Sequence, residues 1–172
     1  PTRLLDWPQN PLIALFFALS YAKYKENSET GVPDYQTDAV VWAVDPVTWN
    51  NTVLEFDPPP GVISPPDAIL QGYGENPASK WPIAVLGTHN SRRIIAQSGV
   101  FVLFGTSAEP MQTMYSQIYF PDDTLVKLVI RKEHIHKLMK SLMNIGISDA
   151  TIYPGLAGIS SDIKRSAGYW MP

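Results

Sequence analysis

The chain has 172 residues, of which 45% are hydrophobic and 17% charged, and its formal net charge is -3. This length suits one globular domain, the apolar fraction excludes a disordered chain, and the acidic balance argues against a protein dominated by non-specific nucleic-acid binding. There is no cysteine, which excludes disulfides and thiolate metal sites and leads us to expect a reducing, cytoplasmic environment.

The opening segment, PTRLLDWPQNP, places a cation, a carboxylate and an indole N–H close together, directly ahead of an apolar helix. Arg3 has a planar guanidinium suited to phosphate or carboxylate, Asp6 can hold that group or accept from a ribose hydroxyl, and Trp7 offers a stacking face. The alternative is a structural pair of Arg3 and Asp6 beside a buried Trp7. Because the chain begins with Pro1 rather than Met, we expect an upstream segment to complete this site.

An N-terminal helix is predicted next, because Asn10 can cap it and Pro11 is favoured at the first helical position. Almost every position from Leu12 to Tyr24 is apolar or small, so we expect a helix buried on most sides, beneath a sheet. The longest apolar run, Leu12 to Leu19, is far shorter than the roughly 20 residues that cross a bilayer, so no membrane association is expected. Residues 26–37 are polar and predict a surface loop.

The middle of the chain predicts strands separated by loops. Buried strands are expected at 39–45 and 100–104, where β-branched and aromatic residues dominate, and another strand at 125–131. Residues 46–49 predict a short helix or turn, and residues 83–86 a short edge strand. The proline-rich connection at 57–82 is long for a compact domain and is typical of a loop that shapes a binding surface.

The C-terminal part predicts an amphipathic helix over residues 133–144, where apolar residues recur at helical spacing and Gly146 supplies the C-cap. A short strand is predicted at 150–153 and a last short helix at 158–165. Helices mixed with strands, without a βαβ rhythm or a repeat, predict an α+β fold. We expect mixed or antiparallel sheets packed with a buried N-terminal helix and an amphipathic C-terminal helix, in one domain over residues 1–172.

A helical turn is predicted at 90–97, on which Arg93 and Gln97 are i, i+4 neighbours and share a face. The turn at Ser98-Gly99 then places Gln97 at the mouth of the sheet. This pair is either part of a binding site, or a solvated arginine and a glutamine that bonds loop backbone.

Among the three histidines, only His89 lies where it could join such a site. His134 and His136 are i, i+2 and face apart on a helix, so they cannot share a metal ion. We therefore predict no metal site.

Three blocks of the sequence together resemble the FRG domain family, which is named for a Phe-Arg-Gly motif. They are residues 1–18 (PTRLLDWPQNPLIALFFA), 93–103 (RIIAQSGVFVL) and 142–159 (LMNIGISDATIYPGLAGI). The Phe-Arg-Gly strand of the family, and the His-Gly that usually precedes PTRLLDW, are expected upstream of Pro1. Pro8 stands where the family pattern often has Thr or Ser.

The layout of that family is in turn similar to the ADP-ribosyltransferase superfamily, which implies NAD as the substrate. By this resemblance Gln97 stands where those enzymes commonly place a catalytic Glu. A neutral amide supplies only a dipole near the oxocarbenium-like ribose, so either the activity is weak, or Asp6 contributes the negative charge, or the analogy does not hold. The residues implied to bind NAD are Thr2, Arg3, Trp7 and Arg93.

The resemblance implies an ADP-ribosyltransferase-like enzyme, toxin-like, from a bacterial or phage conflict and defence system, with a nucleic acid or protein as target. The alternatives are a non-catalytic module that binds a nucleotide or nucleic acid within a larger assembly, and a purely structural module. The enzyme hypothesis expects Arg3, Asp6 and Gln97 to meet around one small-molecule cavity.

Overall fold

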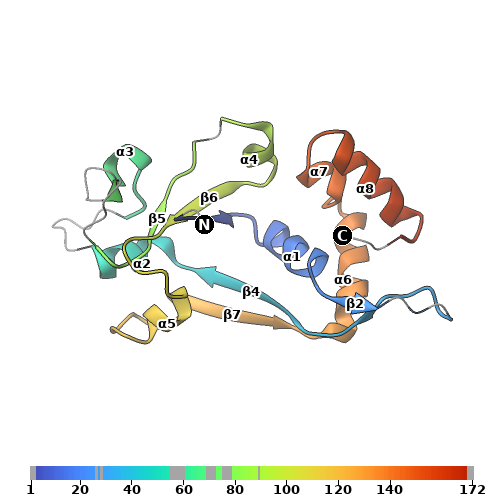
Figure 1. Ribbon diagram of the computed structural model, residues 1–172, viewed down its shortest axis with the longest axis horizontal. Coiled ribbons are helices and arrows are strands. Elements are labelled where there is room, and N and C mark those ends of the chain that lie inside the picture. The colour runs from blue at the N-terminus through green and yellow to red at the C-terminus, as the bar shows by residue number, and fades with distance from the viewer. Residues whose placement is uncertain are drawn as a thin grey trace. The chain divides into compact units, whose positions relative to one another are not determined.

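The computed structural model describes residues 3–25, 27, 29–54, 61–68, 73–74, 79–88 and 90–169. Within these residues helices and short strands alternate irregularly and the strand pairs include antiparallel ones, so the predicted α+β class is confirmed (Figure 1). The chain divides into two compact units. Unit 1 comprises Pro1–Trp7, Trp42–Thr88 and Gly99–Val126, and unit 2 comprises Pro8–Val41, His89–Ser98 and Lys127–Pro172.

The three-stranded sheet has the order β1-β6-β5, with β6 (Gly99–Leu103) in the centre. The opening motif forms β1 (Leu4–Pro8), a strand that the sequence pattern did not predict. The predicted edge strand is confirmed as β5 (Ile83–Val85), which pairs antiparallel with β6 so that Ala84 lies opposite Val102.

A two-stranded sheet is formed by β4 (Ala39–Val44) and β7 (Leu125–Ile130), and the chain passes between the units inside each of these strands. Both strands were predicted, but the burial predicted for 39–45 is wrong, because only Ala39 of β4 is buried. Residues with β-branched side chains favour extended backbone whether or not a second layer covers them. The pattern therefore identified the strands without determining their burial.

In unit 1, α2 (Pro46–Val53) packs against β5 in the hydrophobic core. Asp45 caps this helix, because its carboxylate accepts from two backbone N–H groups of the first turn. Asn50 is fully buried, and its side chain donates to the Ala84 carbonyl and accepts from the Ala84 N–H, both at 2.8 Å. These two bonds satisfy backbone groups of β5 as a further strand would. Unit 1 also contains the short helices α3 (Pro65–Ala68) and α5 (Met111–Tyr115).

In unit 2, the N-terminal helix α1 (Pro11–Ser20) packs against α6 (Lys132–Asn144). Asn10 caps α1 as predicted, and its side chain accepts from the Leu12 N–H at 2.9 Å. The expectation of a helix buried on most sides beneath a sheet is wrong. The principal partner of α1 is another helix, and its buried residues are Ile13, Phe16 and Leu19.

The helix α1 ends at Ser20 and does not reach Tyr24 as expected, because Tyr24–Lys25 forms β2, which pairs antiparallel with β3 (Asp34–Tyr35). The loop predicted at 26–37 is therefore wrong in part, because it contains β3. The amphipathic helix predicted at 133–144 is confirmed as α6, and Gly146 follows it with a φ of +85°, as a C-cap glycine does.

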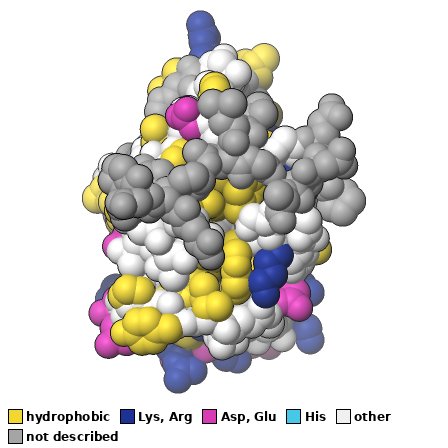
Figure 2. Space-filling model, turned by 90° about the vertical axis from the view of Figure 1, so that its left-hand side faces the viewer, with side chains coloured by type: hydrophobic (Ala, Val, Ile, Leu, Met, Phe, Trp, Pro, Cys, Tyr) yellow, Lys and Arg dark blue, Asp and Glu magenta, His cyan; other side chains and the backbone are white. Residues whose placement is uncertain are grey.

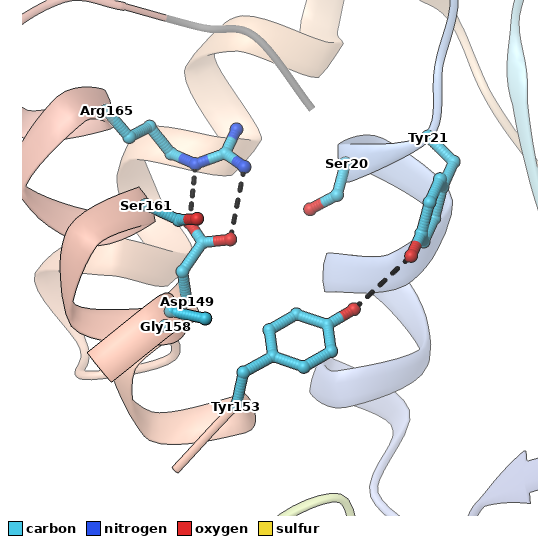
Figure 3. A pocket seen from close by; sticks show the side chains of 8 residues that line it. Ser20, Tyr21, Asp149, Tyr153, Gly158, Ser161 and Arg165 are labelled. Carbon is cyan, nitrogen blue, oxygen red and sulfur yellow. Dashed lines mark hydrogen bonds and ion pairs between the residues drawn. The ribbon is translucent and has the colours of Figure 1, made fainter. Parts of the chain in front are cut away.

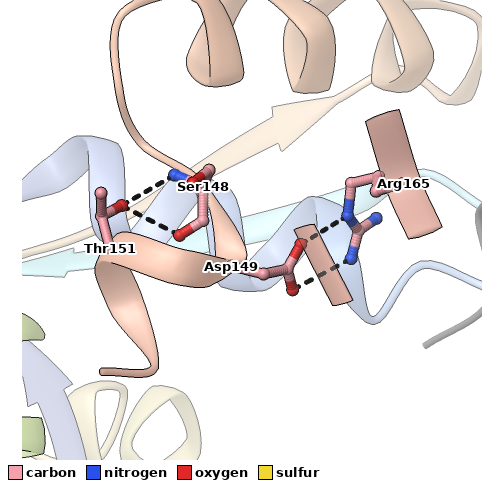
Figure 4. Close-up of polar contacts among 4 residues, drawn as sticks. All are labelled: Ser148, Asp149, Thr151 and Arg165. Carbon is pink, nitrogen blue, oxygen red and sulfur yellow. Dashed lines mark hydrogen bonds and ion pairs between the residues drawn. The ribbon is translucent and has the colours of Figure 1, made fainter. Parts of the chain in front are cut away.

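The short strand predicted at 150–153 is wrong, because α7 (Asp149–Ile152) is a helix (Figure 4). The backbone N–H of Ser148 donates to Thr151 Oγ1 at 2.9 Å, which is half of a capping box. This local hydrogen bonding outweighed the β-branched pattern. Two other predicted helices are confirmed: α4 (Arg92–Ala96), which Ser91 caps, and α8 (Leu156–Ser166).

Within the described part of the chain, no helix is both long enough and apolar enough to cross a bilayer.

Candidate functional site

Helix α4 brings the predicted residues Arg93 and Gln97 to the C-terminal end of α7. Gln97 Nε2 donates to the Ile152 carbonyl at 3.3 Å, and Arg93 Cζ lies 5.4 Å from the centroid of the Tyr153 ring. The two side chains therefore contact consecutive residues, which confirms that they share a face. The bond from Gln97 satisfies a carbonyl of the last turn of α7, whereas the structural alternative for this residue expected a bond to loop backbone.

Tyr153 also lines a cavity of about 200 Å³ that lies entirely within unit 2. Its walls come from the C-terminal end of α1, from α7 with Tyr153, and from α8 (Figure 3). The residues that line it are Ser20, Tyr21, Asp149, Tyr153, Ala157, Gly158, Ser161 and Arg165.

The close approach of α7 and α8 depends on Gly158. A Cβ at this position would lie 2.0 Å from the Tyr153 carbonyl oxygen and 2.7 Å from that of Asp149. Both distances are too short for a carbon atom, so only glycine lets α8 lie this close to α7. The wall of the cavity is therefore set by a backbone contact.

A buried ion pair joins α7 to α8 at the cavity wall (Figure 4). Arg165 Nε and Nη2 donate to the two carboxylate oxygens of Asp149 at 2.7 and 3.3 Å, and each side chain is 7% exposed. The guanidinium also stands 6.0 Å from the centroid of the Phe16 ring in the unit 2 core. Because the two charges balance, this wall presents polar atoms without a net charge.

Two tyrosine hydroxyls meet at the cavity. Tyr21 and Tyr153 are 3.4 Å apart at their oxygens, and Figure 3 shows the two hydroxyls facing each other. Burial and the hydrogen bond with Tyr21 raise the pKa of Tyr153, so its hydroxyl stays protonated at neutral pH. Tyr153 therefore presents a neutral hydroxyl.

Ser20 adds a third hydroxyl from the last residue of α1. Its Oγ is buried and has no hydrogen-bond partner among the described residues. In Figure 3 this hydroxyl points toward the Asp149–Arg165 pair. A buried polar atom without a hydrogen-bond partner is rare in native proteins, so this hydroxyl is a candidate to bind a ligand.

In unit 1, the side chain of Arg3 hydrogen-bonds backbone carbonyls and does not pair with Asp6. Its Nη2 donates to the carbonyls of Tyr73 at 3.2 Å and Gly74 at 2.7 Å, whereas Asp6 is exposed and takes part in neither ion pair of the described residues. Arg3 Nη1 is buried and lacks a partner among the residues that the structure describes. Trp7 packs against the unit 1 core, as the structural alternative for this residue expects.

The predicted site residues are thus distributed over both units. Arg93 and Gln97 come together in unit 2, whereas Arg3, Asp6 and Trp7 belong to unit 1. Thr2 and His89 lie outside the described residues. A common cavity for Arg3, Asp6 and Gln97 stays a prediction.

Sequence reasoning missed the cavity of unit 2, although its α7 and α8 walls lie within or near the third block. Asp149 and Arg165 are sixteen positions apart, so no local motif links them. The signal that could have found them is the pair of opposite charges on two neighbouring short helices, because an isolated charge is rarely buried.

Basic side chains do not gather on the face shown in Figure 2, where the described Lys and Arg residues lie mainly at the margins. Hydrophobic side chains lie next to one another in its central and lower parts. No group of three or more His, Cys, Asp or Glu side chains that could hold a metal ion occurs among the described residues. Among the described residues, the cavity of unit 2 is the candidate site whose lining is defined.

Comparison with known proteins adds one family match. The FRG domain model matches residues 1–27, which contain Arg3, Asp6 and Trp7 together with the whole of α1, Ser20 and Tyr21. Neither a curated protein nor a solved structure matches the sequence. The chain is therefore similar to the FRG domain over its first 27 residues.

Proposed function

We propose that this chain is a nucleotide-binding module, with NAD as its ligand, and that the site is the cavity of unit 2 together with Arg93 and Gln97. One observation carries this proposal: Arg93 and Gln97 contact Tyr153 and Ile152 at the C-terminal end of α7, beside a cavity lined by hydroxyl groups. A concave site with a few convergent polar groups is the usual form of a small-molecule site.

The groups around Tyr153 suit different parts of a nucleotide. Arg93 is exposed, and its planar guanidinium has the donors that bind phosphate oxygens in pairs. The ring of Tyr153 supports this cation through a cation–π contact. The cavity wall is neutral overall, so it suits an uncharged part of the ligand. Phosphates are therefore expected at Arg93, outside the cavity.

Calorimetric titration of the chain with NAD tests the proposal. Arg93→Ala removes a charged donor, which is worth about 1.5–3 kcal/mol, so NAD affinity should fall by roughly ten- to a hundredfold. Arg92→Ala is the matched control, because Arg92 is an exposed arginine of the same helix. Absence of NAD binding, or equal losses in the two variants, would contradict the proposal.

A second candidate is transfer of ADP-ribose from NAD. It is favoured by Gln97, whose amide is held by Ile152 while no described residue donates to its Oε1. In this reaction the bond between ribose C1′ and nicotinamide breaks, nicotinamide leaves with the electron pair, and an acceptor bonds to C1′ and releases a proton. A fixed carbonyl dipole can stabilise the positive charge that develops on the ribose.

The state of the Asp149 carboxylate makes NAD binding a stronger proposal than transfer of ADP-ribose. Asp149 lines the cavity, but both of its oxygens accept from Arg165. If the chain is active, we propose a toxin-like role in a bacterial or phage conflict system, with a nucleic acid or protein as acceptor.

Incubation with NAD labelled in its ADP-ribose part tests the enzymatic candidate. Nicotinamide release or labelling of an acceptor should be lost in Gln97→Ala and retained in Gln112→Ala, an exposed glutamine of α5. Asp6→Asn measures the predicted contribution of that carboxylate. NAD binding without release or labelling would exclude the enzyme and leave the binding module.

A further inference from the structure

The polar groups of the unit 2 cavity lie on three separate walls. Ser20 and Tyr21 come from the end of α1, Asp149 and Tyr153 from α7 and the residue after it, and Ser161 and Arg165 from α8 (Figure 3). A flat base carries its polar atoms in the plane of its ring. A sugar ring carries hydroxyls on successive carbons, which point in different directions, and groups on three walls can bind these at the same time.

The carboxylate of Asp149 keeps acceptor positions after pairing with Arg165. An ionised carboxylate has about four lone-pair sites, and Arg165 occupies one on each oxygen. One further hydroxyl can therefore donate to each oxygen. Because Arg165 already neutralises Asp149, this wall accepts hydroxyl groups but favours neither a second cation nor a phosphate.

The buried hydroxyl of Ser20 points to the same wall. A serine hydroxyl both donates and accepts, as a sugar hydroxyl does, and Ser20 Oγ has neither kind of partner among the described residues. A ligand hydroxyl between Ser20 and Asp149 would remove the cost of this unpaired atom. The nearby ring of Tyr153 offers an apolar face for the C–H side of a sugar.

The size of the cavity limits what it can enclose. About 200 Å³ lies below the roughly 300–1,000 Å³ of sites that enclose a drug-sized ligand. One ring of a nucleotide fits such a volume, whereas a whole dinucleotide does not.

From the three polar walls, the neutral ion pair, the unpaired serine and the volume, we infer that this cavity binds the ribose ring of a ribonucleotide through its vicinal hydroxyls. This inference rests on the proposed function and deepens it, because it assigns the sugar to the cavity and the phosphate to Arg93. Asp149 and Ser20 recognise the hydroxyls, and Arg165 positions Asp149.

Competition against NAD with three small probes tests this assignment on the whole chain. Ribose 5-phosphate should compete, and 2-deoxyribose 5-phosphate should be about tenfold weaker, the effect of one lost hydrogen bond of about 1.4 kcal/mol. Nicotinamide alone should compete weakly. Stronger competition by nicotinamide than by ribose 5-phosphate would assign the cavity to the base and overturn the inference.

Ser20→Ala provides the second arm. It removes a hydroxyl that has no described partner, so the fold should keep its stability while affinity for ribose 5-phosphate falls about tenfold. Tyr21→Phe, at a residue that is 71% exposed, removes another cavity hydroxyl without removing core packing and should weaken the sugar phosphate severalfold. The matched controls are Ser160→Ala and Tyr119→Phe, two exposed residues that do not line the cavity.

The outcomes separate this inference from the proposed function. NAD binding that depends on Arg93 but is the same in Ser20→Ala, with equal affinity for the two sugar phosphates, would overturn the ribose assignment and leave the nucleotide-binding module. Binding of ribose 5-phosphate that depends on Ser20, without any binding of NAD, would support the ribose site and overturn the nucleotide proposal.

Discussion

Helices α6 and α8 of unit 2 are both amphipathic, but they use their apolar faces in opposite ways. In α6 the apolar residues Ile135 and Met139 are fully buried in the core. In α8 the buried residues are Gly158 and Arg165, whereas its apolar stripe of Leu156, Ile159 and Ile163 is exposed. The stripe has the i, i+3, i+7 spacing that is typical of a packed helix face.

The difference shows that amphipathic spacing predicts a helix but does not determine which face is buried. Two contacts determine which face of α8 packs on α7. Arg165 forms an ion pair with Asp149, and Gly158, which has no side chain, allows the two backbones to touch. The same two contacts shape the cavity of unit 2. A helix that builds a polar site can therefore leave its apolar side to solvent.

Removal of the Asp149 charge, which pairs with Arg165 of α8, should have the largest effect on stability. Asp149→Asn leaves the Arg165 guanidinium, which cannot lose its proton, buried without a counter-charge, so the free energy of unfolding should fall by about 3–5 kcal/mol. Urea unfolding measures this change. Asp38→Asn is the control, because its partner Arg131 has a 70% exposed side chain and such a pair contributes little. Equal losses in both variants would contradict this account of α8.

Truncation of one apolar side chain on each helix compares the two faces directly. Met139→Ala in α6 should lower the free energy of unfolding by about 2–5 kcal/mol, because it opens a cavity in the core. Ile163→Ala in α8 should change it by no more than about 0.5 kcal/mol, because that side chain is exposed. Thermal and urea unfolding give both values. A large loss in Ile163→Ala would show that the stripe is covered in solution.

Gly158→Ala tests the contact between the backbones of α7 and α8. The new methyl group would overlap the Tyr153 and Asp149 carbonyl oxygens, so the helices must separate, at about 1–3 kcal/mol. NAD affinity should fall in parallel, since Gly158 lines the cavity. Ser160→Ala, an exposed position of the same helix, should be neutral in both measurements. Unchanged stability of Gly158→Ala would show that the two helices can move apart freely.

The pH dependence of stability should show the smallest effect and arises at the N-terminus of α6. The Asp38 carboxylate accepts from the Lys132 N–H at 2.9 Å and from Arg131 at 3.0 Å, and these bonds lower the pKa of Asp38 in the folded state. Its stabilisation is therefore present above the unfolded value of about 3.9 and is lost as the pH falls through the lower folded pKa. No side chain caps α8 in this way.

Unfolding curves of the natural chain and of Asp38→Asn between pH 7 and pH 3 measure this contribution. The difference between the two should be present at neutral pH and should shrink below about pH 4, where the carboxylate becomes protonated. A difference that stays constant to pH 3 would contradict a role for the ionised form.

Much of the secondary structure could be predicted, because it depends on local chemistry. Asn10 and Ser91 cap the helices that follow them, and the apolar spacing of 133–144 gave α6. The failures have specific causes. The strand predicted at 150–153 is a helix because Ser148 and Thr151 form a capping box. The opening motif was interpreted as a binding site or a structural ion pair, whereas Leu4–Pro8 is a strand that pairs with β6.

The candidate site was predictable only where its residues are close in sequence. Arg93 and Gln97 share a face because they are one helical turn apart, and the structure confirms it. Ser20, Asp149 and Arg165 come from three segments that no spacing rule connects. Arg3 was assigned to a ligand, but the structure shows its Nη2 bonded to the Tyr73 and Gly74 carbonyls.

The sequence by itself determined the α+β class, most helix starts and the placement of Arg93 and Gln97 on one helix face. Each of these depends on residues within a few positions of one another. Only the tertiary structure decided which face of α8 is buried and that Asp149 and Arg165 meet beside Ser20. Burial of a charge is favourable only when an opposite charge lies beside it. Whether two such residues meet depends on how distant segments of the chain pack together.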